Sequence, residues 1–152
     1  MVTRKMLLKS IADVVSKNFT NVNIYADEVI EGFKKPSFFV RLLMTKKTVN
    51  KSISEIRLNV ILTYYPQSKN NREFEFANVM DLLDESFGID LNVEERALHI
   101  EQISHDRIGE KSDIMQSTIL IRYYDETGYT PDTGEIAGGV NVRLVEDEMG
   151  EL

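Results

Sequence analysis

Asp132-Thr133-Gly134 matches the three-residue signature of aspartic proteases. In those enzymes the aspartate lies in a buried loop with apolar flanks, and a second carboxylate shares its proton. Here the flanking residues are Pro131 and Glu135, in a segment rich in glycine and acidic residues. We therefore interpret the three residues as a turn.

His99 and His105, with Asp106 beside the second, are the candidates for a metal site. In an uninterrupted strand the two histidines would face the same way. Zinc needs further ligands at tighter spacing, and the chain contains no cysteine. We interpret both as histidines of the surface or of the edge of the core.

A cluster of acidic residues near two glycines resembles a calcium loop in composition only, because the alternating ligand pattern of an EF-hand is missing. The cluster comprises Asp125, Glu126, Asp132 and Glu135, around Gly128 and Gly134. The sequence also contains no phosphate-binding glycine loop and no nucleophile elbow. We therefore predict a non-enzymatic protein without cofactor or metal.

The elements that would position these residues follow from periodicity. Apolar residues at helical spacing predict a helix over residues 4–17, with Thr3 as its N-cap and Asn18 in the left-handed conformation that ends it. A second helix has its apolar face at Phe76, Val79, Met80, Leu83 and Phe87. Gly88 follows as its C-terminal cap.

Strands are predicted over residues 22–25, 38–45, 56–65, 89–93, 97–103 and 114–124. The second and third of these form a long hairpin around a turn at residues 46–52. The fold class is therefore α+β: an antiparallel or mixed β-sheet of long hairpins packed by two helices, with a flexible acidic C-terminal tail. We expect a domain over residues 1–125 and a mobile glycine-rich tail over residues 126–152.

Charge is unevenly distributed along the chain, whose formal net charge is -7. Residues 1–51 hold ten Lys or Arg against four acids, residues 52–125 hold seven against fourteen, and residues 126–152 hold one against seven. This balance argues against binding of duplex nucleic acid, although residues of the basic first third could still form a basic patch. No apolar run reaches the roughly 20 residues that span a bilayer. We expect a soluble protein that acts without a membrane.

Lys46, Lys47 and Lys51 lie near the tip of the predicted hairpin. One interpretation is a solvated tip, and the other is an arm that reaches an acidic neighbouring subunit. Exposed sheet edges accept further strands, and charge selects the correct partner. These lysines are our candidate subunit-interface residues.

The stretch from Ile24 to Val40 resembles the phage tail terminator (tail completion) family of Gram-positive phages and prophages. It runs from Ile24-Tyr25 through Glu31-Gly32-Phe33 and Pro36 into Phe38-Phe39-Val40. Leu62-Thr63-Tyr64-Tyr65-Pro66 and the closing Tyr123-Tyr124 are also similar to that family. The resemblance covers about residues 1–125.

The resemblance implies a structural protein that caps the tail tube as a ring, commonly a hexamer, ends tube polymerisation and offers the surface for head attachment. The implied partners are other copies of the chain, the tail tube protein and the head-completion protein. The implied location is the host cytoplasm during assembly and then the virion tail. Two alternatives stay open: another head-tail joining component such as a stopper, or a ligand-binding regulatory module with a pocket of convergent polar groups.

Overall fold

The computed structural model describes residues 1–26, 32–70 and 72–130. Within these ranges the chain forms two helices and six strands: α1 (Arg4–Asn18), β1 (Asn23–Ala26), β2 (Ser37–Thr48), β3 (Ile53–Tyr65), α2 (Arg72–Phe87), β4 (Asp90–Val93), β5 (Arg96–Ile108) and β6 (Ile114–Glu126). The strands make one sheet in the order β1-β2-β3-β6-β5-β4. The predicted α+β class is confirmed.

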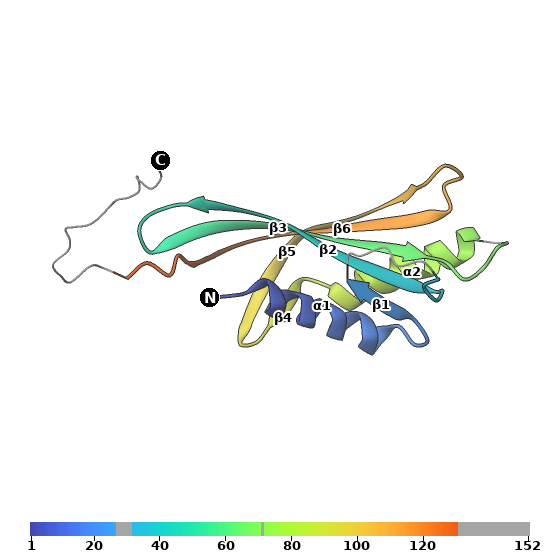
Figure 1. Cartoon of the computed structure of the whole chain (residues 1–152), viewed down its shortest axis with the longest axis horizontal. Coiled ribbons are helices and arrows are strands. Elements are labelled where there is room, and N and C mark those ends of the chain that lie inside the picture. Colours follow the sequence, from blue (N-terminus) through green and yellow to red (C-terminus); the bar gives the residue numbers. More distant parts are fainter. Residues whose placement is uncertain (27–31, 71, 131–152) are drawn as a thin grey trace, which may run out of the picture.

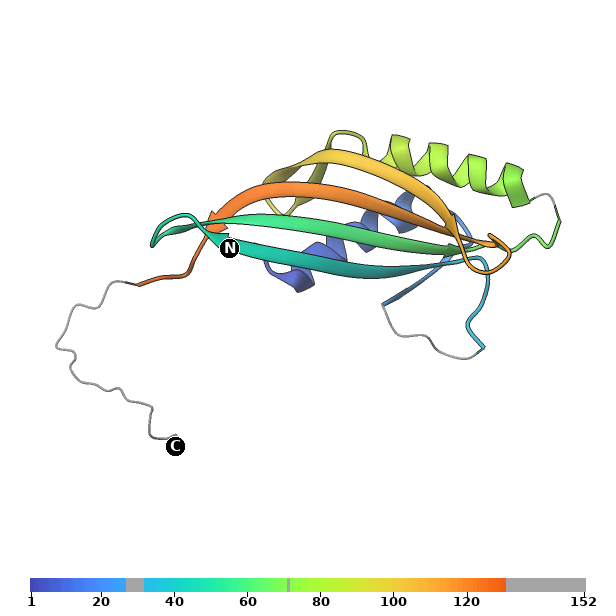
Figure 2. The same cartoon turned by 90° about the horizontal axis from the view of Figure 1, so that it is seen from above.

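Four long antiparallel strands, β2, β3, β6 and β5, form the body of the sheet. Figure 1 shows α1 beneath this sheet, and Figure 2 shows α2 running beside β5. β1 pairs in parallel with the first part of β2, which makes the sheet mixed. The β2–β3 turn lies at one end of the elongated sheet and the β5–β6 turn at the other (Figure 1).

The first helix begins as predicted, because the Thr3 side chain accepts a hydrogen bond from the Met6 N–H at 3.2 Å. Its buried face consists of Leu7, Ile11 and Val15. The predicted left-handed ending at Asn18 is wrong. Asn18 is the last helical residue, and its side chain donates to the Val14 carbonyl at 2.7 Å, which satisfies one of the terminal acceptors.

The second helix buries Phe76, Val79, Leu83 and Phe87, as its periodicity predicted. Gly88 ends it at φ 60°, a left-handed conformation that side chains disfavour, and its N–H donates to the Asp84 carbonyl at 3.1 Å. These side chains join the inner faces of the sheet and α1 in one core. The largest fully buried core members are Phe38, Phe76, Leu7, Ile11, Leu58, Leu62, Leu83, Leu91, Leu98, Met115, Ile119 and Ile121.

The first hairpin is longer than its hydrophobic pattern predicted, because polar residues continue β2 to Thr48. The turn is tight: the Asn50 side chain accepts hydrogen bonds from the backbone N–H groups of Ser52 and Ile53 at 2.8 and 2.9 Å. The predicted turn at residues 46–52 is therefore wrong at its start. Lys46 and Lys47 belong to the strand.

On the sheet face opposite the helices, four aromatic rings pack at one end. Phe33 lies 5.0 Å from Phe39 and 4.8 Å from Tyr65 between ring centroids, and Tyr25 lies 5.1 Å from Phe39. Three of the four belong to the Ile24–Val40 stretch. Aromatic pairs at these distances stabilise beyond their buried area, so this stretch attaches the β1–β2 connection to the sheet.

The last strand extends through Glu126, and the chain after it contacts the first hairpin. The Thr127 N–H donates to the Ser52 carbonyl at 2.9 Å, and the Thr127 hydroxyl donates to the Lys51 carbonyl. The ordered body therefore includes residues just beyond 125. The Asp132-Thr133-Gly134 turn, Glu135 and the rest of the acidic tail lie outside the described residues, and the domain bounds stay a prediction.

Candidate interaction surfaces

The two histidines lie on opposite faces of β5, contrary to the geometry expected of an uninterrupted strand. The register shifts between Ile100 and Gln102, and one inserted residue reverses which face the following side chains take. His99 is exposed and lies 3.6 Å from Asp90, whereas the side chain of His105 is only 12 % exposed and turns toward α2. The histidines therefore do not converge on one site.

A serine, a histidine and an aspartate are hydrogen-bonded in series between the sheet and α2. The two ring nitrogens of His105 lie 2.7 Å from the Ser117 hydroxyl and 2.8 Å from Asp84 Oδ1. A nucleophilic serine must be open to substrate beside an oxyanion hole. Ser117 is completely buried. These contacts thus join β5, β6 and α2, and a substrate cannot reach the Ser117 hydroxyl.

Acidic and histidine side chains do not gather into a metal-binding group of three anywhere in the described ranges. Neither described helix is long and apolar enough to cross a membrane.

The lysines predicted at the interface do lie at one end of the molecule, but they do not form a patch on one face. Lys46 and Lys47 are neighbours on β2, so their side chains point to opposite faces. Lys51, in the turn, lies with its Nζ 5.9 Å from the centre of the Tyr129 ring. All three are exposed. They surround the tip of the hairpin on both faces.

One edge of the sheet runs along β2 beside these lysines. β1 pairs with β2 only from Ser37 to Val40. Among the described residues, no strand pairs with that side of β2 from Leu43 to Thr48. A strand edge of this kind presents unpaired N–H and C=O groups to any further strand.

The opposite edge of the sheet is acidic. Exposed carboxylates lie on α2 beside β5 and in the β4–β5 turn: Asp81, Asp84, Glu85, Glu94 and Glu95. β2 itself carries Arg41, Lys46 and Lys47 and no acid. β2 and the surface formed by α2 and the β4–β5 turn therefore differ in charge, with Lys9 and Lys17 of α1 lying beside Glu85 and Glu94.

Ion pairs cross the strands on the sheet face opposite the helices. Arg122 lies 3.0 Å from Glu101 on β5 and 3.6 Å from Glu55 on β3. Arg57 is the cross-strand partner of Arg122, and it lies 4.0 Å from Glu55. The two carboxylates offset the repulsion that two opposed arginines would otherwise cause. The charges of these four residues on this face are therefore largely paired.

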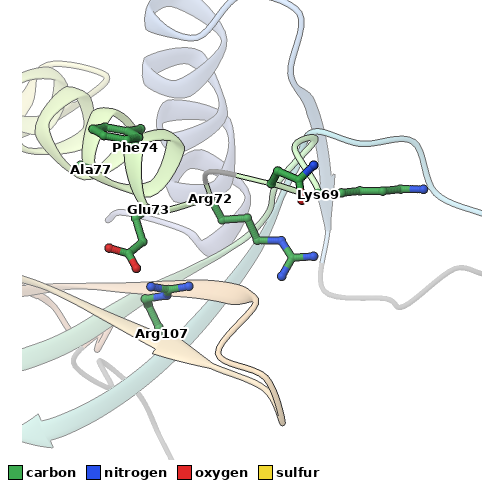
Figure 3. Close-up of a pocket in the computed structure, with 7 residues that line it drawn as sticks. Lys69, Arg72, Glu73, Phe74, Ala77 and Arg107 are labelled. Carbon is green, nitrogen blue, oxygen red and sulfur yellow. The ribbon is translucent and has the colours of Figure 1, made fainter.

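An open cleft of about 660 Å³ lies at the start of α2, at the far end of the sheet from the lysines. Figure 3 shows Arg72 and Arg107 beside it, with the Glu73 and Arg107 side chains directed toward one another. Arg107 is held in place, because it stacks 4.9 Å from the Phe76 ring centre and donates to the Ser112 carbonyl at 2.9 Å. Phe74 is 75 % exposed at the rim. An open site with an exposed aromatic ring fits a protein surface better than a small ligand.

A conserved-sequence model described as "Phage tail terminator protein" matches residues 6–133. This match covers most of the chain, so the protein belongs to the phage tail terminator family. It is a structural component of tail assembly and not an enzyme. No curated protein matches the sequence at a significant level.

Two solved structures are similar in fold. A chain of the virion of a native gene transfer agent particle aligns with a TM-score of 0.46 and 15 % identity, covering 80 % of this chain and 90 % of that one. The sheath/tube terminator of an extracellular contractile injection system, PVC, aligns with a TM-score of 0.49 and 12 % identity, covering 99 % and 68 %.

The lysines lie at the hairpin, as the sequence predicted, but three features of the surface were not predicted. These are the exposed Phe74, the acidic surface formed by α2 and the β4–β5 turn, and the open edge of β2. The helical pattern contained a signal for Phe74, since it falls outside the apolar stripe that begins at Phe76. The other two depend on which strands become neighbours.

Proposed function

We propose that this protein caps the tail tube as a ring, ends its polymerisation and provides the surface to which the head attaches. The family match over residues 6–133 carries the proposal. The ring is a hexamer of identical subunits that assembles in the host cytoplasm and remains in the virion tail. Its contacts are with its own copies, the tail tube protein and the head-completion protein. A source in a phage or prophage of Gram-positive bacteria is part of the same proposal.

The charge difference between β2 and the surface formed by α2 and the β4–β5 turn supports a ring. Subunits of a closed ring meet through two different surfaces that complement each other. A lysine-bearing edge at β2 and carboxylates elsewhere on the subunit supply two such surfaces, and their attraction would steer association and reject the wrong pairing. Lys46, Lys47 and Lys51 are the proposed interface residues on the basic side.

The two ends of the elongated sheet differ in a way that also supports the proposal. The hairpin with its lysines lies at one end, and the cleft with Phe74 lies at the other (Figures 1 and 3). A ring placed between tube and head needs two distinct docking faces. A stopper would need the same kind of surfaces, so its partner protein distinguishes the two functions. The open shape of the cleft disfavours the ligand-binding module.

The test is electron microscopy of tubes grown from purified tail tube protein with and without this protein. We expect ring-shaped caps at tube ends and tubes that no longer lengthen. Tubes that grow without limit in its presence would reject termination. Binding to the head-completion protein without any effect on tubes would instead indicate a stopper.

A further inference from the structure

We propose that residues 140–145 of one copy pair as an added strand with the open edge of β2 in the neighbouring copy. The acidic residues 146–148 that follow would then meet the lysines at the tip of that neighbour's hairpin. The inference rests on the proposed ring, since the neighbouring copy is the next subunit of that ring.

The first support is the open edge itself. From Leu43 to Thr48, β2 has β3 on one side and no described strand on the other. Strand addition to such an edge takes its affinity from main-chain hydrogen bonds and its specificity from flanking side chains. Six residues of edge match the six residues of the segment 140–145 in length.

The second support is the place where the described chain ends. Thr127 is hydrogen-bonded to the turn of its own hairpin, and Tyr129 lies against Lys51. Figure 2 shows the last described residues running outward past this hairpin and away from the sheet. The nine residues from 131 to 139 can span about 30 Å when extended. The described chain therefore ends beside its own hairpin, at the end of the sheet that carries the lysines.

The third support is the sequence of the segment. Val140, Val142 and Leu144 alternate with Asn141 and Arg143, the pattern of a strand with two different faces. Two glycines at 138 and 139 precede this segment. Nothing else in residues 131–152 has the same alternation.

Charge selects the direction of the added strand. Glu146, Asp147 and Glu148 follow the segment directly, and Lys46, Lys47 and Lys51 lie at the C-terminal end of β2 and in the turn after it. Only a strand parallel to β2 brings these two groups together. An antiparallel strand would place the acids near Val40 instead. β1 already pairs with the same edge in the parallel direction.

The family match ends at residue 133, so the segment lies beyond the part of the chain that the family shares. One tail and one open edge per copy link the copies head to tail, as a closed ring requires. The acidic tail thus becomes the partner of the interface lysines.

The absence of cysteine from the sequence allows a direct test by disulfide trapping. The full-length variants Thr45→Cys and Val142→Cys are mixed with tail tube protein, oxidised and separated on a non-reducing gel. Parallel pairing brings the two positions opposite each other, within the Cα separation that a disulfide accepts. A matched control mixes Val142→Cys with Asn78→Cys, whose cysteine lies at an exposed position of α2.

We expect the first mixture to give about tenfold more covalent dimer than the control, because pairing raises the effective concentration of the two thiols. Lys46→Glu with Lys47→Glu in the Thr45→Cys chain should lower that yield toward the control. A yield equal to the control overturns the proposal. So does a double variant, Thr45→Cys with Val142→Cys, that forms only an internal crosslink, since the tail would then pair with its own edge.

Tube length, measured in the same samples, tests the proposed termination separately from the proposed strand pairing. Capped tubes without the crosslink overturn the strand pairing and leave the ring. A specific crosslink without capped tubes keeps the pairing between copies and rejects termination.

Discussion

Asp125 near the end of β6 accepts a hydrogen bond from the backbone N–H of Val2 at 2.7 Å, which joins the two ends of the folded body. Arg96 donates to the same carboxylate at 3.1 Å. Burial alone would raise the pKa of Asp125, but hydrogen bonds from the N–H groups of Val2 and Glu126, the N-terminal ammonium group and Arg96 together lower it below its ordinary value of 3.8.

Asp125→Ala should therefore lower the free energy of unfolding by about 1–3 kcal/mol at pH 7, because it leaves buried donors without an acceptor. A carboxylate with a depressed folded-state pKa stabilises above its unfolded pKa, and the effect is lost as pH falls through the folded value. The difference between wild type and variant should thus shrink below pH 3.8. Urea unfolding followed by circular dichroism measures it.

The control for this prediction is Glu126→Ala, which removes the exposed carboxylate of the next residue. It should change stability by less than about 0.5 kcal/mol. An equal loss in both variants would show that Asp125 has no special role.

Glu75 connects the start of α2 to the end of β3. Its carboxylate accepts hydrogen bonds from the Tyr64 hydroxyl at 2.6 Å and from the N–H groups of Gln67 and Ser68 at 3.0 Å. Burial, and then the Glu75 carboxylate, raise the pKa of Tyr64 well above its ordinary range. Burial alone would raise the pKa of Glu75, yet these hydrogen bonds lower it below its ordinary value of 4.5.

We expect Glu75→Ala to cost about 1–3 kcal/mol and Tyr64→Phe about 1 kcal/mol at pH 7. The two losses should be less than additive, because the same hydrogen bond is removed in both. The contribution of Glu75 is lost as pH falls below 4.5, by the same sign argument as for Asp125. Full additivity in a double-mutant cycle, with Glu73→Ala as the control on the same turn, would contradict this coupling.

The local pattern of the chain predicted both helices, the Thr3 cap, the Gly88 cap and the long strands, because these depend on residues close in sequence. The parallel pairing of β1 with β2 was not predictable from the sequence, and neither was the register shift after Ile100 that reverses the faces of β5. Each depends on which strands become neighbours and in which register they pair. The interface lysines were found as a charge cluster. Lys46 and Lys47 lie on opposite faces because β2 continues to Thr48. The hydrophobic pattern did not predict this part of the strand, because its residues are polar.

Phe74 and Phe76 lie two residues apart on α2 with opposite environments, 75 % and 1 % exposed. Phe76→Ala should cost about 3–5 kcal/mol, because it leaves a cavity beneath Arg107. Phe74→Ala should cost less than about 0.5 kcal/mol. Thermal unfolding compares the two directly, and a destabilised Phe74→Ala variant would show that the ring packs against the body.

The Ser117–His105–Asp84 series should contribute to stability and not to hydrolysis. Ser117→Ala and His105→Ala should each lower the free energy of unfolding by about 1–3 kcal/mol, because each leaves a buried polar group without its partner. The wild type should not react with a fluorophosphonate probe, since Ser117 is completely buried. Covalent labelling that disappears in Ser117→Ala would overturn this interpretation.

The basic hairpin predicts how ring assembly responds to charge. Lys46→Glu, Lys47→Glu and Lys51→Glu together should weaken the ring, because three attractive contacts become repulsive. A matched triple variant, Lys17→Glu, Lys34→Glu and Lys111→Glu, makes the same change in net charge at exposed positions away from the β2–β3 hairpin.

Mass photometry or sedimentation of protein bound to tube ends should show fewer complete rings for the hairpin variant than for the matched one. Added salt should weaken the wild-type ring and have less effect on the hairpin variant, since salt screens exposed charges beyond about 8–10 Å. Equal ring formation by the two triple variants would remove the lysines from the interface. A ring lost equally in both would mean that net charge, rather than the hairpin, controls assembly.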